Sequence, residues 1–337
     1  MPFRTIVGHS RLLSLLSRVI ARDSMPPAVL LAGPPGVGKR LTAIAIAQAV
    51  NCLQPQSGNG FERDACGECA SCRRIARGIH PDVIVVEPGD MGTIKIEQLR
   101  DVIDRSQYRP FEGRRRVVII DEADAAGDDA QSALLKTLEE PPSASIFILV
   151  SSMPDALLPT VLSRCPRLRF SPLSPNEVAR VLVQDHGYSE QEAGIAAAES
   201  DGSIGRALES QSEDLVEARD AAQRILEETA RNTDPVKRIS LARELAEGKG
   251  SPAEERNRLA VRLRSLGSLL RDVGIIATRA DRAMIANADL EQPLEKLASS
   301  FDAQRSMHAY AAVDRALAAL DRNASPKVVA DWLLLEL

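Results

Sequence analysis

Apolar runs of four or five residues recur through the first half of the chain, at 28–32, 83–86, 117–120 and 146–150. Runs that are apolar throughout are typical of strands buried on both faces of a parallel sheet. The segments between these runs carry apolar residues at helical spacing, which predicts helices at 11–22, 41–50, 96–106 and 131–140. Strands that alternate with helices in this way predict an α/β fold with a parallel sheet covered on both faces.

The pattern changes after Phe170. Residues 171–175 read Ser-Pro-Leu-Ser-Pro and predict a hinge, and no convincing strand pattern follows them. Apolar stripes at helical spacing continue to the end of the chain, as at Leu259, Leu263, Leu266 and Leu270. We therefore expect an α/β domain at 1–172, a small helical domain at 173–212 and a longer all-helical domain at 213–337.

Composition narrows the classes of protein that fit this fold. The 337 residues are 44% hydrophobic but only 3% aromatic, so we expect a core of Leu, Ala, Val and Ile. The net charge of −5 argues against a protein that coats nucleic acid by bulk positive charge, and the arginine run 114–116 is expected to be solvated. No apolar run approaches the ~18 residues of a membrane helix, and the N-terminus lacks a signal-peptide pattern. A cytoplasmic location without membrane contact is expected.

A glycine-rich loop joins the first predicted strand to the helix at 41–50. It reads Gly-Pro-Pro-Gly-Val-Gly-Lys-Arg at 33–40. Glycines let backbone N–H groups wrap around phosphates, and the lysine adds a positive charge for the outer phosphates. The hydroxyl residue that would ligate Mg²⁺ is replaced by arginine, so efficient Mg²⁺-dependent hydrolysis is not predicted. The expected ligand is ATP or ADP, and the alternative is a turn that binds nothing. The candidate binding residues are Gly33, Gly36, Gly38, Lys39 and Arg40.

An acidic pair follows the strand predicted at 117–120. Asp121 is placed to hold Mg²⁺ or its water, and Glu122 to polarise an attacking water. An acidic pair at a strand end can also be merely solvated. Its position downstream of the glycine loop favours the catalytic interpretation.

Four of the five cysteines lie close together, at Cys52, Cys66, Cys69 and Cys72. Thiolates at this spacing come within reach of one tetrahedral ion, and zinc is the commonest occupant of four-cysteine sites. The run from 66 to 72 also begins like an iron–sulfur motif, but the fourth position of that motif is Ala76. With four protein ligands no open position remains, so we expect a structural zinc site.

Several strings in the chain resemble one family. They are Ile-Val-Gly-His at 6–9, the glycine loop, the cysteine cluster, Pro-Phe-Glu-Gly at 110–113, Ala-Leu-Leu-Lys-Thr-Leu-Glu-Glu-Pro-Pro at 133–142, Ser-Arg-Cys at 163–165 and Gly-Ser-Ile-Gly-Arg-Ala-Leu at 202–208. Together they resemble the bacterial clamp-loader ATPases of the AAA+ class, the family of the gamma/tau and delta-prime subunits of DNA polymerase III. The motifs cover about residues 3–210, and the remainder is similar in architecture alone.

The resemblance implies an architecture and roles for individual residues. It implies an AAA+ phosphate-loop module with a zinc knuckle at 52–72, then a helical lid and an all-α collar that oligomerises. Arg164 would be an arginine finger in the ATP site of a neighbouring subunit. Arg206 would sense nucleotide from the lid, and Ser151 or Ser152 would be the first sensor. Lys136 is expected to face solvent.

The resemblance also implies partners. They are the gamma/tau and delta subunits of a pentameric clamp loader and, through the complex, a sliding clamp and primed DNA. Within the family, Arg40 favours the delta-prime type, whose own ATPase would be weak or absent. The alternatives are an active gamma/tau-type motor and an AAA+ DNA remodeller outside clamp loading.

Overall fold

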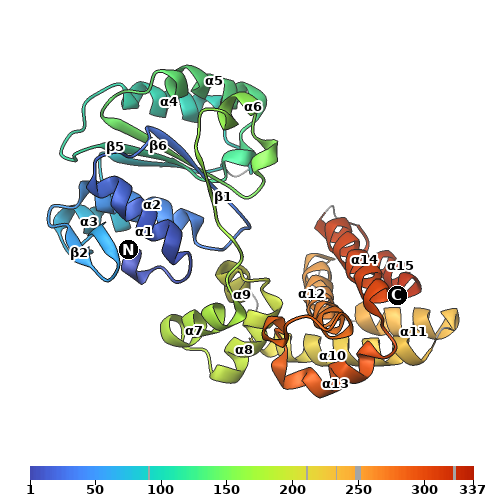
Figure 1. Cartoon of the computed structure of the whole chain (residues 1–337). Helices are drawn as coiled ribbons and strands as arrows, with labels where there is room; N and C mark the ends of the chain where they lie inside the picture. Colours follow the sequence, from blue (N-terminus) through green and yellow to red (C-terminus); the bar gives the residue numbers. More distant parts are fainter. Residues whose placement is uncertain (90–91, 210–211, 233, 247–251, 322–323) are drawn as a thin grey trace. The chain divides into compact units, whose positions relative to one another are not determined.

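The computed structural model describes residues 1–89, 92–209, 212–232, 234–246, 252–321 and 324–337. The chain divides into two compact units, Met1–Leu173 and Ser174–Leu337 (Figure 1). The first unit contains the sheet, and the second is helical. None of the described helices is long and apolar enough to cross a membrane.

Five parallel strands form the sheet of the first unit. They are β1 (Ala28–Ala32), β4 (Val83–Val86), β5 (Arg116–Ile120), β6 (Ser145–Ser151) and β7 (Arg167–Arg169), in the order β4-β5-β6-β1-β7. The predicted parallel sheet is confirmed, and the four predicted strands are present. The edge strand β7 was not predicted, because it is short and contains a single apolar residue.

Helices cover both faces of this sheet (Figure 1). One face carries α1 (Ser10–Ala21) and α2 (Lys39–Asn51), and the other carries α4 (Ile96–Ser106), α5 (Asp128–Glu139) and α6 (Pro159–Leu162). Alternate side chains of each strand enter opposite layers, because successive residues of a strand point to opposite faces. In β5, for example, the side chains at 117 and 119 pack with α1 and α2, while those at 118 and 120 pack with α4 and α5.

A small subdomain is inserted between α2 and β4. It consists of an antiparallel hairpin, β2 (Gln56–Gly58) and β3 (Phe61–Asp64), followed by the short helix α3 (Ala70–Ala76). The short 3-10 helix η1 (Phe3–Thr5) packs beside the hairpin, where the Phe3 and Phe61 ring centroids lie 6.0 Å apart. The remaining 3-10 helices of this unit are η2 (Ala123–Ala125) and η3 (Pro154–Ala156).

The arginine run at 114–116 is not uniformly solvated, contrary to the prediction. Arg116 is buried, and its Nη2 lies 3.0 Å from Asp82 Oδ1. Asp82 also accepts hydrogen bonds from the backbone N–H groups of residues 111, 112 and 113. Burial acts to raise the pKa of Asp82, but these hydrogen bonds outweigh it and leave the pKa lowered. Arg116 is therefore buried because it pairs with a carboxylate 34 residues away in sequence.

The second unit begins at Ser174, within the predicted hinge. Ser174 caps the first helix in a capping box with Glu177, and Pro175 occupies the first turn, where its missing N–H costs nothing. The described helices are α7 (Pro175–His186), α8 (Glu190–Glu199), α9 (Ile204–Glu209), α10 (Ser212–Arg231), α11 (Pro235–Ala246), α12 (Pro252–Ala277), α13 (Glu291–Ala298), α14 (Ala303–Asp321) and α15 (Pro326–Glu336), with 3-10 helices η4 (Arg282–Met284) and η5 (Ala288–Leu290). One leucine-rich core joins α10 to α15.

Polar contacts tie α8 to α12 within this unit. Ser265 Oγ donates to Glu199 Oε1 at 2.6 Å, and Ser268 Oγ donates to the carbonyl of Ala198 at 3.0 Å. Glu199 Oε2 is buried without a hydrogen-bond partner, and burial raises the pKa of this carboxyl to about 7.

The chain divides at 173/174, and the predicted boundary at 212 between lid and collar stays a prediction.

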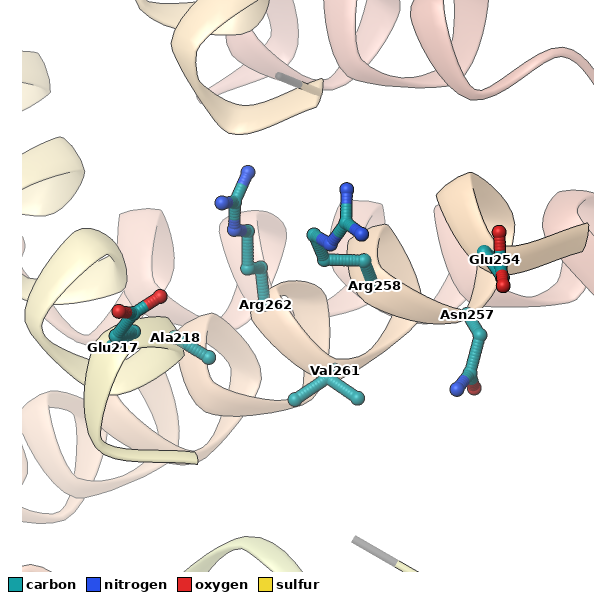
Figure 2. A pocket seen from close by; sticks show the side chains of 7 residues that line it. All are labelled: Glu217, Ala218, Glu254, Asn257, Arg258, Val261 and Arg262. Carbon is teal, nitrogen blue, oxygen red and sulfur yellow. The ribbon is translucent and has the colours of Figure 1, made fainter. Parts of the chain in front are cut away.

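Two surface features complete the second unit. The guanidinium of Arg315 in α14 lies 5.3 Å from the ring centre of Trp332 in α15. A hollow of about 230 Å³ lies between α10 and α12. Figure 2 shows Arg258 and Arg262 of α12 pointing to the same side of that hollow. Its lining residues are Glu217, Ala218, Glu254, Asn257, Arg258, Val261 and Arg262.

Candidate functional site

The carboxyl ends of four parallel strands meet at one edge of the sheet, and the candidate site lies there. β1 continues into the glycine loop, β4 into Glu87, β5 into Asp121 and β6 into Ser152. Open parallel sheets bind ligands at this edge because their loops converge there. The predicted residues Lys39, Arg40, Asp121 and Ser152 are brought together by this arrangement.

The loop backbone requires glycine at two points. A Cβ at Gly33 would lie 2.3 Å from the carbonyl oxygen of Phe170, so any larger residue would displace the backbone that follows β7. Gly38 precedes the first turn of α2 with a φ of 97°, a left-handed conformation that glycine adopts without strain. The loop therefore places the first turn of α2 at the edge of the sheet. The first N–H groups of a helix have no partner within the helix.

Lys39 bonds to the chain's own oxygen atoms. Its Nζ donates to the carbonyls of Gly33 at 2.7 Å and Pro34 at 2.5 Å, and to Ser152 Oγ at 3.0 Å. Burial lowers the pKa of Lys39, and the nearby carboxylates of Asp124 and Asp121 act in the opposite direction. Phosphate oxygens that entered the loop would compete with these carbonyls for the ammonium group.

Arg40 forms two ion pairs across the strand ends. Its Nη1 lies 3.0 Å from Asp121 Oδ2, and its Nη2 contacts the Glu87 carboxylate. Asp121 is largely buried and accepts a further hydrogen bond from the backbone N–H of Glu122 at 3.1 Å. Glu87 had no assigned role in the sequence analysis, although its place directly after a predicted strand was a usable signal.

The donor set at this edge does not fit a divalent ion bound in the manner of phosphate-loop proteins. Position 40 offers a guanidinium in place of a hydroxyl, and that guanidinium bonds to Asp121. The nearest hydroxyl along α2, Thr42 Oγ1, donates to the carbonyl of Gly38 at 3.0 Å. The Arg40–Asp121 contact is a specific observation at this position, and the expectation that Arg40 disrupts an Mg²⁺ site stays a prediction.

Three further residues border the site. Glu122 is exposed and has a left-handed φ of 48°, and its proposed role with water stays a prediction. Asp124 Oδ1 accepts a hydrogen bond from the backbone N–H of Ser152 at 3.1 Å, which fixes the end of β6. His9 reaches the loop from the N-terminal side, with Nε2 3.1 Å from the carbonyl oxygen of Val37.

The four clustered cysteines converge as predicted. The Sγ atoms of Cys52, Cys66, Cys69 and Cys72 lie within 4.8 Å of one another. A tetrahedral zinc ion with Zn–S bonds of about 2.3 Å places sulfur atoms about 3.8 Å apart. The observed separations from Cys52 to Cys66, from Cys52 to Cys69 and from Cys66 to Cys72 are 3.6, 4.0 and 4.0 Å. The donor set and spacing fit a four-thiolate metal ion.

Backbone N–H groups donate hydrogen bonds to sulfur atoms of this cluster. The N–H of Cys66 donates to Cys52 Sγ at 3.3 Å, and that of Cys69 to Cys66 Sγ at 3.3 Å. At Cys69, burial opposes ionisation, but hydrogen bonds from the Cys72 and Leu53 backbones lower the pKa of the thiol to about 6. In contrast, burial alone raises the pKa of the separate Cys165 to about 11.

The N-terminal segment is fastened to this cluster. Asp64, at the end of the hairpin, accepts hydrogen bonds from the backbone N–H groups of Phe3 at 2.8 Å and Arg4 at 3.2 Å. The Arg4 guanidinium donates to the carbonyls of Ala65 at 2.7 Å and Cys66 at 2.9 Å. Folding of the cluster thus orders the segment that leads into α1.

The two remaining predicted arginines each form an ion pair of their own. Arg164 forms an ion pair with Glu139 and donates to the carbonyl of Thr160 at 2.8 Å, and its side chain is 32% exposed. Arg206 belongs to the second unit, where its Nη1 lies 3.5 Å from Asp201 Oδ2. Lys136 is exposed on α5, as expected. The finger and sensor roles of these arginines stay predictions.

Comparisons with known proteins agree with the fold of the first unit. The family described as "DNA polymerase III, delta subunit" matches residues 8–174. The delta' subunit of DNA polymerase III from Pseudomonas aeruginosa is 39% identical over 153 residues, which are 45% of this chain and 45% of that protein. The tau subunit from Escherichia coli is 33% identical over 211 residues, 61% of this chain and 32% of that protein. The chain thus spans less than half of either relative.

A solved structure, a gamma-subunit-related protein from Thermotoga maritima, covers 95% of this chain and 96% of its own at 16% identity. The TM-score of this match is 0.42.

Proposed function

Given that this chain belongs to the bacterial clamp-loader family of DNA polymerase III subunits, we propose that it is a stator of the delta-prime type. It would occupy one place in a pentameric ring that uses ATP to open a sliding clamp and place it on primed DNA. Its partners would be the gamma/tau and delta subunits. In this role it assists hydrolysis at a neighbouring subunit and hydrolyses little ATP itself.

The observation that carries the stator proposal is the contact between Arg40 and Asp121. A motor subunit needs the strand-end acid for the metal ion that bridges the β- and γ-phosphates. Here that acid pairs with a guanidinium at 3.0 Å. Since the position that would supply the hydroxyl ligand is the same arginine, two parts of the metal site are lost together.

Arg164 supplies what a stator must donate. A guanidinium that reaches a neighbouring active site stabilises charge on the transferred phosphoryl group. Arg164 is partly exposed, and its contacts with Glu139 and Thr160 are at the surface. An exposed ion pair contributes only about 0–1 kcal/mol, so exchange of Glu139 for a phosphate costs little.

The proposal also assigns roles to the cysteine cluster, the glycine loop and the helical unit. The cluster Cys52, Cys66, Cys69 and Cys72 would hold a structural zinc ion. Nucleotide would bind at the glycine loop, with Ser152 as first sensor and Arg206 as the sensor of a lid at 173–212. Residues 213–337 would form the collar that joins the ring.

An active motor of the gamma/tau type is the second candidate. The tau relative from Escherichia coli matches 61% of this chain, a longer stretch than the 45% matched by the delta' relative. A motor should hydrolyse ATP alone or as a homo-oligomer. Steady-state ATPase measurement on the purified chain separates the two, and measurable turnover without partners would favour the motor.

The stator proposal is tested with Arg164→Ala in a complex reconstituted with gamma/tau and delta subunits, clamp and primed DNA. We expect clamp-stimulated ATPase to fall on the order of 10³-fold, as for other arginine fingers, while the complex still assembles. Glu139→Ala is the matched control, because it breaks the same ion pair and keeps the guanidinium. Full ATPase in Arg164→Ala, or an equal loss in Glu139→Ala, would remove the finger assignment.

A further inference from the structure

The guanidinium of Arg40 contacts the acid that would face Mg²⁺ in a phosphate-loop protein. The residue after the loop lysine and the acid at the end of the neighbouring strand are the two protein groups that normally face Mg²⁺. In this chain they bond to each other, with Arg40 Nη1 3.0 Å from Asp121 Oδ2. Glu87 holds the other arm of the guanidinium. A divalent ion in this place would lie against a fixed positive charge and would lack the hydroxyl ligand.

Arg40 can still serve a ligand while it keeps both carboxylates. A guanidinium has five N–H donors in one plane, and the two ion pairs leave donors unused. The Arg40 side chain is 51% exposed, whereas Asp121 behind it is 11% exposed. Asp121 thus anchors the guanidinium from its buried side, and the exposed part of the group can form charge-assisted bonds to phosphate oxygens.

We propose that this loop binds ADP or ATP in metal-free form and that Arg40 is a built-in cation in place of Mg²⁺. The inference rests on the nucleotide binding assigned above to the glycine loop, and it adds the form of the ligand. Lys39 and Arg40 then provide two adjacent positive charges for the phosphates. Because Arg40 is already paired with two acids, the site holds nucleotide without the charge arrangement that hydrolysis requires.

The test is calorimetric titration of the full chain with ADP and with ATP, in buffer with and without magnesium. Magnesium is omitted rather than chelated, and the metal content of the cysteine cluster is measured before and after. For the native chain we expect dissociation constants that differ by less than about threefold between the two buffers, because no metal ligand is gained.

Arg40→Thr restores the missing hydroxyl and frees Asp121. We expect it to bind about tenfold or more weakly without magnesium, since a charge-assisted contact is lost, and to recover when magnesium is added. Arg40→Lys keeps a positive charge and should stay independent of magnesium. Thermal unfolding of each variant shows whether the first unit is intact, and Arg40→Lys keeps the test decisive if Arg40→Thr does not fold.

Three results would overturn the inference. They are native affinity that rises about tenfold with magnesium, no nucleotide binding in either buffer, and an Arg40→Thr variant that stays independent of magnesium. None of these decides the stator proposal, which depends on the effect of Arg164→Ala in the assembled complex. The two proposals can therefore fail separately.

Discussion

The cysteine cluster and the phosphate loop lie in the same unit, yet their polar groups are satisfied in different ways. The cluster brings four thiols within 4.8 Å and directs backbone N–H groups at the sulfur atoms, an arrangement that is complete only with a cation. The loop bonds Lys39 and Arg40 to oxygen atoms of the chain itself. The cysteine cluster offers four thiols to a metal ion, and the loop pairs its cationic side chains with oxygen atoms of the chain.

The difference teaches that two clusters of polar side chains in one fold can satisfy their charges in opposite ways. If one of four thiolates around a metal ion were lost, the remaining buried thiolates would hold the ion poorly, and their charge would be left without compensation. In the loop, a longer cationic side chain at position 40 supplied its own charge and remained compatible with the acids around it. The predictions below test this contrast.

The largest effect is expected for Cys72→Ser. Cys72 is fully buried, and its replacement should release the metal and destabilise the first unit by several kcal/mol, because structural zinc sites contribute about 10 kcal/mol or more to folding. Elemental analysis and chemical unfolding measure both effects. Cys165→Ala is the control, since this cysteine lies outside the cluster, and unchanged metal content in Cys72→Ser would contradict the assignment.

The buried carboxyl of Glu199 lies outside both sites, and it allows the cost of an incompletely paired polar group to be measured through the pH dependence of stability. The carboxyl of Glu199 accepts one hydrogen bond, from Ser265 Oγ, and burial raises its pKa from 4.5 to about 7. The folded state therefore binds this proton more tightly, and stability of the second unit should fall as pH rises from about 4.5 to about 7, by up to about 3 kcal/mol.

Glu199→Gln should remove that decline, because an amide at this position does not ionise. Urea unfolding of the native chain and the variant across this pH range measures the difference. A decline of equal size in both proteins would assign the pH dependence to another group.

Lys39→Ala should weaken nucleotide binding by about tenfold to a hundredfold, because charged hydrogen bonds contribute about 1.5–3 kcal/mol. Metal content should not change, since the cluster does not depend on the loop. Lys136→Ala removes an exposed lysine of the same unit and serves as the control. Titration calorimetry gives both affinities, and equal affinities for the two variants would exclude the loop as the binding site.

The smallest effect is expected for Ser152→Ala, which removes the hydroxyl that accepts from Lys39 Nζ at 3.0 Å. Loss of one such bond should reduce nucleotide affinity by about threefold to tenfold. Ser151→Ala is a close control, because the buried Ser151 Oγ has no hydrogen-bond partner. If the two serine variants bound nucleotide equally well, Ser152 would not be a sensor.

Local sequence was enough to predict the strands that carry the site. The run at 28–32 and the glycines after it fix both the strand β1 and the loop, because the apolar pattern and the required backbone conformations are local properties. The convergence of the four cysteines also followed from spacing alone. These predictions needed no knowledge of distant partners.

Contacts between distant residues were not predictable in this way. Arg116 was expected in solvent because its partner Asp82 is 34 residues away, and the bond from Arg40 to Glu87 depends on which strands are neighbours. The edge strand β7 shows only Leu168 as an apolar residue, and its pairing with β1 defines it as a strand. These features depend on the order of the strands in the sheet, and the periodicity of the sequence gives no information about that order.

The contact between Arg315 and Trp332 has a practical consequence. Trp332 is the chain's single tryptophan and belongs to the helical unit, whereas the four clustered thiols belong to the other. Indole fluorescence therefore reports on the helical unit alone, and with the proposed metal ion bound, absorbance from metal–thiolate bonds would report on the sheet-containing unit alone. Each half of the molecule would then have its own optical signal, so both could be followed in one unlabelled sample.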